Sequence, residues 1–206
     1  MKTFFIRHGM TYGNTKHQYI GRTDQPLCEE GREAIIAVKE RGIYPQINKV
    51  YVSPKKRARE TAQILFPEAE QIVIEDLREM DFGVFEERSY IDMADDQIYQ
   101  DWVAGKCEGQ IPGGELKSAF TERSCKAFLE LIKTLNEEDS PIVFVVHGGT
   151  IMSILSSFAV PVREYYDFYV KNGYGYECDW DGKALTILKE FGVDPSWKTP
   201  EEGKSE

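Results

Sequence analysis

The sequence is poor in the patterns that mark metal sites and membrane spans. Its 206 residues include three histidines and four cysteines, and no two cysteines form a CxxC pair. The wide separation of the cysteines predicts reduced thiols, with a disulfide pair as the alternative. No apolar run reaches the length of a membrane span. Because His17 is followed by no ligand at helical spacing, we expect no dedicated metal site.

Positive charge is also in deficit. The chain has 25 Lys and Arg against 35 Asp and Glu, which gives a net charge of −10 and a pI near 4.9. This balance argues against a nucleic-acid or anionic-membrane binder, which would carry excess positive charge. A few local cations can still dominate one pocket and bind a small anion. The first residues are too short an apolar run for a signal peptide, so we expect a cytoplasmic protein.

What the sequence does contain is a regular alternation of apolar runs and helical patterns. Short runs that are apolar on both faces predict buried parallel strands. They lie at residues 4–6, 50–52, 72–74 and 142–146. Between them, apolar residues recur at helical spacing, and this alternation predicts an α/β layered fold. Later runs are expected to be edge strands, at residues 164–170, 174–180 and 184–190.

One domain is expected to span residues 1–206. Between about 76 and 114 the alternation lapses into a mixture of acids, aromatics and turn residues, which predicts an inserted cap over one end of the sheet. The final residues, about 192–206, are polar and contain proline, and we expect them to form a loose tail.

Two apolar runs end in a histidine followed by glycine. Arg7-His8-Gly9 follows the first run, and His147-Gly148 follows the run at 142–146. Ligands of open α/β sheets bind beyond the carboxyl ends of the strands, so both histidines are expected at one site. Either histidine alone could be a hydrogen-bonded structural residue, but two in matching positions favour a shared site. Gly148 opens a helical stretch whose free N–H groups would favour an anion.

A third run leads into "YVSPKKRARETAQIL", residues 51–65. Ser53 is expected to cap the following helix and Pro54 to occupy its first position. Lys55, Lys56 and Arg57 would then lie in the first turn, where the helix dipole disfavours cations. This conflict indicates an external anion, with a solvated basic face as the alternative reading for the two lysines.

Five motifs occur in the order and spacing of one known family. They are "IRHGMTYGN", "SPKKRARETA", "LREMDFGVFEE", "PGGE" and "VVHGGT". From residue 3 to about 160 the chain resembles the histidine phosphatase superfamily, also called the phosphoglycerate mutase-like family. The resemblance implies a three-layer α/β fold with a mostly parallel central sheet, helices on both faces and a small inserted cap. Within the family it is similar to the phosphatase branch, and especially to α-ribazole phosphatases.

The resemblance also implies catalytic roles. His8 would be the nucleophile, attacking as a neutral imidazole to form a phosphohistidine. His147 would donate a hydrogen bond to the phosphoryl group, which it does best when protonated. The remaining phosphate-binding residues would be Arg7, Asn14, Arg57 and Gly148.

The departing alcohol needs a proton, and Glu79 matches the acidic position of the phosphatase branch. Shielding by the cap would raise its pKa, as a general acid requires. A surface glutamate beside Arg78 is the alternative, with Asp81 and Glu86 as stand-ins for the acid. Glu115 matches the family's "GGE" motif but fits equally as the cap of the next helix.

Candidate substrate-binding residues are Thr23, Tyr90 and Trp102. With Tyr99, the two cap aromatics could stack on a nucleoside-like base or simply pack the cap. Thr23 matches a position that mutases share, so it does not separate the two activities.

These observations predict a phosphomonoester hydrolase that needs neither metal nor cofactor. Its substrate would be α-ribazole 5'-phosphate or a similar small phosphorylated metabolite, with no nucleic acid or membrane as partner. A cofactor-dependent phosphoglycerate mutase is the alternative reaction, and a non-catalytic phosphoester-binding protein is the alternative of another class. A homodimer is compatible with the sequence.

Overall fold

The computed structural model describes residues 1–192. Its strands are β1 (Lys2–Arg7), β2 (Lys49–Val52), β3 (Glu70–Val73), β4 (Ile142–Val146), β5 (Ala159–Val160), β6 (Gly175–Trp180) and β7 (Leu185–Glu190). Its α-helices are α1 (Tyr12–Thr15), α2 (Glu29–Glu40), α3 (Lys56–Leu65), α4 (Gln97–Ala104), α5 (Lys117–Ile132) and α6 (Gly148–Phe158). Short 3-10 turns are η1 (Glu75–Leu77), η2 (Gly83–Phe85), η3 (Glu137–Asp139) and η4 (Tyr165–Phe168). Apart from residue 192, the predicted loose tail lies outside the described residues.

The strands form one mostly parallel sheet in the order β3-β2-β4-β1-β6-β7-β5. The four strands predicted from apolar runs are confirmed as β1 to β4, and they pair with one another in parallel. β6 runs antiparallel to both β1 and β7.

The prediction of three edge strands after residue 160 is wrong. β6 and β7 lie inside the sheet, and β3 and β5 form its edges. β6 can lie against β1 because Gly175 has no side chain to collide with the carbonyl of Phe5. Residues 165–168 form η4, which is closed at its start by reciprocal hydrogen bonds between Glu164 and Asp167.

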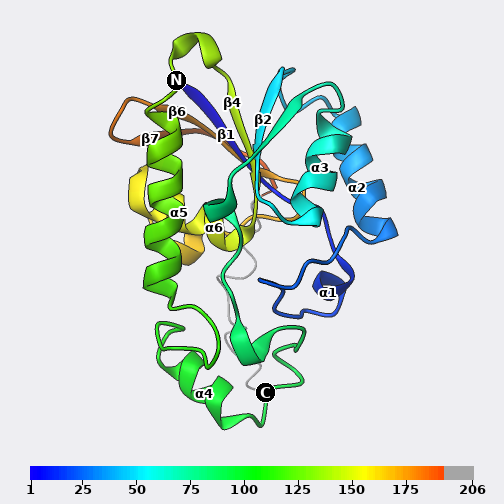
Figure 1. Ribbon diagram of the computed structural model, residues 1–206, viewed down its shortest axis with the longest axis vertical. Helices are drawn as coiled ribbons and strands as arrows, with labels where there is room; N and C mark the ends of the chain where they lie inside the picture. The colour runs from blue at the N-terminus through cyan, green and yellow to red at the C-terminus, as the bar shows by residue number, and fades with distance from the viewer. Residues whose placement is uncertain (193–206) are drawn as a thin grey trace, which may run out of the picture.

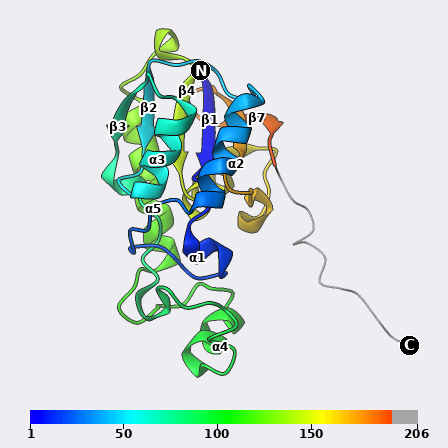
Figure 2. The same ribbon diagram turned by 90° about the vertical axis from the view of Figure 1, so that its right-hand side faces the viewer.

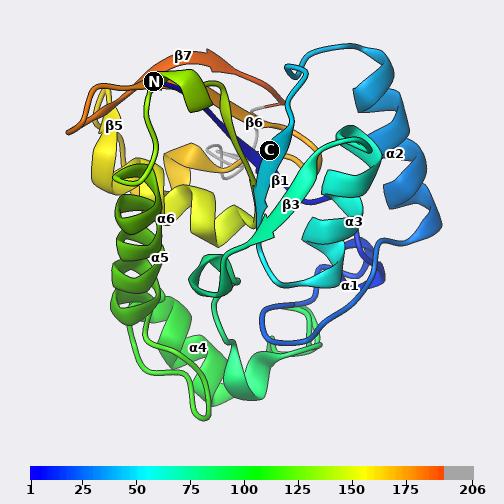
Figure 3. The same cartoon turned by 45° about the horizontal axis from the view of Figure 1, so that its top comes forward.

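Helices cover both faces of the sheet (Figures 1 and 3). Side chains alternate along a strand, so Phe4 and Ile6 pack on one face and Phe5 on the other. The first face buries apolar residues of α2 and α3, and the second buries those of α5 and α6. Strands that are apolar on both sides therefore produce the three layers that were predicted.

Residues 76–114 extend beyond the lower end of the sheet in Figures 1 and 2. This cap contains η2 and α4 and has a small core of its own, to which Phe120 of α5 contributes. Tyr99 and Trp102 pack edge-on or tilted against Phe85 inside it. Within residues 1–192, no helix has the length and apolar character needed to cross a membrane.

The start of α3 differs from the prediction. Lys55, not Ser53, precedes the first helical residue and makes no side-chain cap, so Pro54 lies outside the helix. The carboxylate of Asp24 instead accepts a hydrogen bond from the backbone N–H of Lys56 at 2.7 Å. The carboxylate of Asp24 is thus an anion within the protein that offsets part of the unfavourable positive charge in this first turn. The sequence had predicted an external anion in that role.

Candidate active site

Three parallel strands end at the same edge of the sheet and bring distant residues together. His8 follows β1, Ser53 follows β2 and His147 follows β4. Backbone hydrogen bonds continue the ladder past the strands, from His8 N–H to Val146 and from Ser53 N–H to Val145. The rings of His8 and His147 consequently lie with their centroids 5.1 Å apart.

His8 is held in one orientation and one tautomer. Its ring is buried, and Nδ1 lies 2.6 Å from the carbonyl oxygen of Gly9. A carbonyl can only accept, so Nδ1 carries the hydrogen and Nε2 keeps its lone pair. Burial lowers the pKa of His8 well below its ordinary value, and the positive charges of Arg57 and Arg7 lower it further. The imidazole is therefore neutral.

Arg57, from the first turn of α3, is fully buried. Its guanidinium donates to the carbonyls of Ile20, Gly21 and Thr23 at 2.9–3.1 Å, and Nε donates to His147 Nδ1 at 3.3 Å. Burial lowers its pKa to about 10, so the group stays charged at neutral pH. Four of its five N–H bonds are used in this way, and the second hydrogen on Nη1 remains.

Glu86 fixes the loop that Arg57 binds. Its carboxylate accepts from the backbone N–H groups of Gly21, Arg22 and Thr23, and from the Thr23 hydroxyl at 2.7 Å. Burial alone would raise the pKa of Glu86, but these bonds and one from Phe82 N–H lower it overall. Thr23, predicted to bind substrate, thus has its hydroxyl engaged by Glu86 and its carbonyl by Arg57.

His147 has both ring nitrogens engaged. Nδ1 accepts from Arg57, so Nε2 carries the hydrogen, which points to the hydroxyl of Ser53 at 2.6 Å. Burial lowers the pKa of His147 well below its ordinary value, and Arg57 lowers it further. In the protein without a bound anion, burial and the two neighbouring guanidinium groups thus disfavour the protonated His147 that the resemblance implied.

Arg7 lies near both histidine rings, since its charge lowers the pKa of His8 and of His147. Its Nη1 donates to the carbonyl of Val170 at 2.8 Å, and its guanidinium lies 5.2 Å from the ring centre of Tyr169. Within the described residues its buried Nε has no partner. A Cβ placed on Gly148 would lie 3.4 Å from this Nε. The start of α6 therefore lies next to this unused N–H donor.

Asn14 lies on α1 with its carbonyl oxygen already engaged. Oδ1 accepts from the N–H of Thr11 at 3.1 Å and from Asn172 Nδ2 at 3.4 Å. The same amide of Asn172 donates to the carbonyl of His8 at 2.9 Å. Asn14 keeps its amide hydrogens and is linked through Asn172 to the carbonyl of His8, so it is a neutral donor close to that residue.

Glu79 reaches the start of α6 from the chain that follows β3. One carboxylate oxygen accepts from its neighbour Met80 N–H at 2.9 Å and the other from Gly149 N–H at 3.0 Å. A Cβ on Gly149 would overlap a carboxylate oxygen of Glu79 in its present position, so the glycine lets this carboxylate lie close to the start of α6. Burial raises the pKa of Glu79, and the two backbone bonds and Arg57 only reduce the shift.

Glu79 also lines a cavity of about 200 Å³. It is lined by Tyr19, Glu79, Met80, Phe82, Trp102, Cys107, Lys117, Phe120, Gly149, Met152, Tyr165 and Tyr166. Trp102 lies in this lining, as a substrate contact would require. Tyr90 does not: its ring is half exposed and lies 5.8 Å from that of His17, on the outside of the cap.

Several residues of the site escaped prediction. Thr61 accepts from the N–H of Gly9 at 2.9 Å, and Ser53 contacts His147. Both residues belong to the sequence motif that contains Arg57, so their hydroxyl groups could have been recognised as candidate site groups. Asn172 lies 164 residues from the carbonyl that it binds, and no local pattern marks it. Among the described residues, no three potential metal ligands cluster closely enough to hold an ion.

Acidification is expected to destabilise the fold through its two buried histidines. Folding lowers the pKa of His8 and His147 from 6.5, so below that pH the unfolded chain binds more protons. The free energy of unfolding should then fall with pH by up to about 1.4 kcal/mol per unit for each histidine. Folding raises the pKa of Glu79 above 4.5, so this carboxyl group makes the free energy of unfolding increase as the pH falls toward 4.5.

Urea unfolding of the wild-type protein and His8→Gln, followed from neutral pH down to about pH 5.5, measures this effect. The variant should lose about half of the pH dependence, because one of the two titrating groups is gone. An identical pH dependence in the two proteins would show that His8 is not held neutral.

This fold, with two histidines and two arginines gathered at the carboxyl edge of the sheet, is that of the histidine phosphatase superfamily. Branch 1 of that family matches residues 3–191, and the chain belongs to it. Members of the family are phosphatases or mutases.

Individual relatives carry several names. "Probable phosphoglycerate mutase GpmB" of Serratia proteamaculans is 32% identical over 161 residues, which cover 76% of this chain and 74% of that protein. A candidate phosphoserine phosphatase of Hydrogenobacter thermophilus is 24% identical over 192 residues, or 91% of this chain and 93% of that protein. The crystal structure of a candidate alpha-ribazole-5'-P phosphatase from Escherichia coli K-12 has a TM-score of 0.80 at 25% identity, covering 92% of this chain and 95% of that one.

Proposed function

We propose that this protein hydrolyses phosphate monoesters through a phosphohistidine formed on His8. The observation that carries the proposal is the state of this residue: a neutral imidazole, fixed by Gly9, whose free Nε2 lies among Arg7, Arg57 and His147. Such a group is a nucleophile surrounded by fixed positive donors. Phosphoryl transfer depends mainly on positioning and on stabilising the charge of the phosphoryl oxygens.

In the first step the lone pair of His8 Nε2 forms a bond to phosphorus while the ester P–O bond breaks. The carboxyl group of Glu79 gives its proton to the departing oxygen and becomes a carboxylate. His8 Nδ1 keeps its hydrogen bond to Gly9, which stabilises the cationic ring of the phosphohistidine. In the second step Glu79 takes a proton from water, the water oxygen bonds to phosphorus, and the N–P electron pair returns to Nε2.

The phosphoryl oxygens would be bound by donors that the structure leaves available. These are the unpartnered Nε of Arg7, the remaining Nη1 hydrogen of Arg57 and the amide of Asn14. A phosphoryl dianion would also raise the pKa of His147, since an opposite charge favours the charged form. The added proton would go to Nδ1, which accepts from Arg57 in the free protein, so His147 becomes a further donor when that bond is exchanged for one to a phosphoryl oxygen.

The cavity beside Glu79 supports a substrate whose alcohol part is planar and uncharged. Most of its lining is aromatic or apolar, and the lining cation, Lys117, is already paired with Glu108 at 2.6 Å. Its ammonium also lies 4.3 Å from the ring centre of Tyr165. A phosphoglycerate carboxylate would find this cation occupied. α-Ribazole 5'-phosphate, named by the structural relative from Escherichia coli, carries an aromatic base and fits this chemistry.

A direct assay separates hydrolysis from the mutase reaction. The protein is supplied in parallel with α-ribazole 5'-phosphate and with 3-phosphoglycerate plus 2,3-bisphosphoglycerate. Phosphate release from the first without isomerisation of the second supports the proposal. Formation of 2-phosphoglycerate without matching phosphate release would make the protein a mutase, and binding without any turnover would make it a non-catalytic phosphoester-binding protein.

Glu79→Gln should slow esters of alkyl alcohols by about 100-fold, the typical contribution of a general acid. Hydrolysis of p-nitrophenyl phosphate should change little, because its leaving group departs without a proton. Steady-state kcat for the two substrate types measures the difference. Glu75→Gln, at an exposed carboxylate of the same segment, is the matched control. Equal losses on both substrates would remove Glu79 from the acid role.

A further inference from the structure

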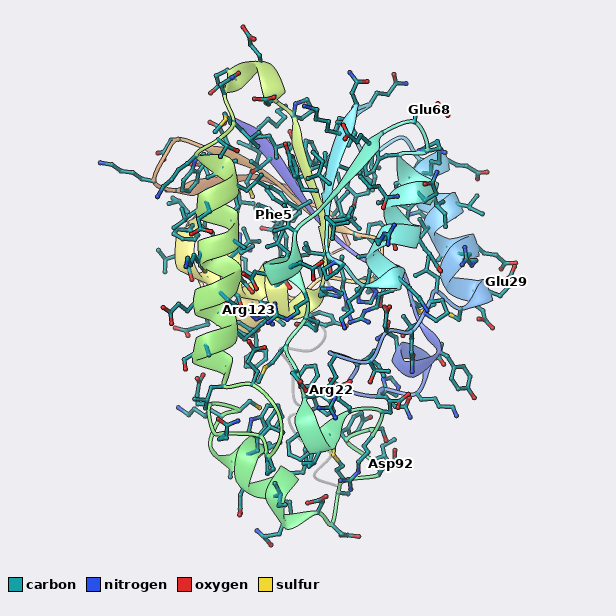
Figure 4. All side chains as sticks on the ribbon, viewed as in Figure 1. Phe5, Arg22, Glu29, Glu68, Asp92 and Arg123 are labelled. Atoms are coloured by element: carbon teal, nitrogen blue, oxygen red, sulfur yellow. The ribbon has the colours of Figure 1, made fainter. Side chains whose placement is uncertain are left out.

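Arg123, which lies outside the phosphate-binding cluster, uses every N–H of its guanidinium in hydrogen bonds within the protein. Arg123 lies on α5, at the height of the carboxyl edge of the sheet (Figure 4), with 13% of its side chain exposed. A guanidinium carries five N–H bonds, and five hydrogen bonds leave this one. Two go to the carboxylate of Glu115, at 2.6 and 2.8 Å, and three go to backbone carbonyls.

Those three carbonyls belong to the segment that carries Glu79. Nη1 donates to the carbonyls of Asp76 and Arg78, both at 2.9 Å, and Nη2 donates to the carbonyl of Glu79 itself at 3.0 Å. Residues 78 and 79 lie outside every helix and strand, so no backbone ladder fixes their position. Arg123 supplies that constraint from a rigid helix.

Glu115 holds the same segment from its other end. Its Oε2 accepts from Asp81 N–H at 3.3 Å, and its own N–H donates to the carbonyl of Asp81 at 2.9 Å. Leu116 precedes α5 as its cap residue and makes no side-chain cap, so Glu115 is not the helix cap that the sequence allowed. The carboxylate instead forms a bidentate pair with Arg123, a geometry that fixes orientation as well as distance.

We propose that Arg123, locked by Glu115, is a positioning residue that sets where the carboxyl group of Glu79 meets the leaving oxygen. This inference rests on the proposed function, because it takes Glu79 to be the proton donor. Arg123 has no N–H left for a substrate, so it acts through the backbone of Glu79. A displacement of about 1 Å in a reacting group can cost on the order of 100-fold in rate.

The test compares Arg123→Ala and Glu115→Gln with Glu79→Gln on an alkyl phosphate and on p-nitrophenyl phosphate. Both new variants should lower kcat for the alkyl ester by about 10- to 100-fold, with little change in KM and little loss on the aryl ester. Guanidinium ion added to Arg123→Ala should restore part of the alkyl activity. Arg163→Ala, which breaks an Arg–Glu pair of the same 2.6 Å length elsewhere, is the control and should leave the ratio unchanged.

A merely structural role predicts another pattern. In Arg123→Ala and Glu115→Gln it would reduce kcat equally for the alkyl and the aryl ester, and guanidinium would not restore the ratio of alkyl to aryl activity. That result overturns the inference. If Arg123→Ala does not fold, Glu115→Gln alone decides, since it keeps the size of the side chain. Selective loss in Glu79→Gln without selective loss in the other two variants rejects the positioning role and leaves the proposed function standing. Equal losses in Glu79→Gln reject the acid role, and the inference with it.

Discussion

His8→Ala is expected to abolish turnover, lowering kcat by roughly 10⁴-fold or more, the scale seen when a covalent nucleophile is removed. His147 cannot take its place, because both of its ring nitrogens are engaged, by Arg57 and by Ser53. The loss should be the same for alkyl and aryl phosphates, because formation of the N–P bond is common to both. Steady-state hydrolysis, with thermal unfolding to confirm the fold, measures it.

The matched control for this variant is His17→Asn. His17 is exposed and has a positive φ of 55°, a conformation that asparagine tolerates. This control should retain full activity. Activity in His8→Ala within about tenfold of wild type would mean that the reaction does not pass through this imidazole.

Arg57→Met is expected to damage stability and activity together. The change removes a buried cation and leaves the carbonyls of residues 20, 21 and 23 without their donor. Each unsatisfied buried group costs about 1–3 kcal/mol, so a loss on the order of 3 kcal/mol in the free energy of unfolding is expected. Losing a preorganised donor to the phosphoryl group should lower kcat/KM by about 10²- to 10³-fold.

Arg59→Met is the control, because Arg59 lies on the same helix with its side chain exposed. Urea unfolding and hydrolysis kinetics, measured on both variants, distinguish the effect of losing the buried guanidinium from the effect of changing an arginine anywhere on this helix. Equal behaviour of the two variants would show that the buried guanidinium supports neither the loop nor the reaction.

The sequence predicted the features that depend on local pattern. Runs that are apolar on both faces form the parallel strands β1 to β4. Because parallel strands end at the same edge of the sheet, His8 and His147 could be predicted to lie close together. The cap was visible as a lapse in periodicity. Helix boundaries were harder, because Asp24, not the local Ser53, satisfies the start of α3.

What the sequence could not show are contacts made across long separations. Asn172 binds the carbonyl of His8 from a loop near the end of the chain, and Arg123 binds the backbone around Glu79 from a helix 44 residues away. Side chain-to-backbone bonds of this kind leave no periodic signal. The neutral state of His147 was also hidden, because it depends on its burial and on the guanidinium beside it.

The central claim is that a phosphoryl group is carried by Nε2 of His8. Rapid quenching of the protein with a ³²P-labelled phosphomonoester, followed by digestion at alkaline pH and mass spectrometry of the labelled peptide, tests it most directly. We expect one label, stable in base and labile in acid, on the peptide that contains Arg7, His8 and Gly9. Turnover without a labelled protein, or a label on any other side chain, would contradict the account.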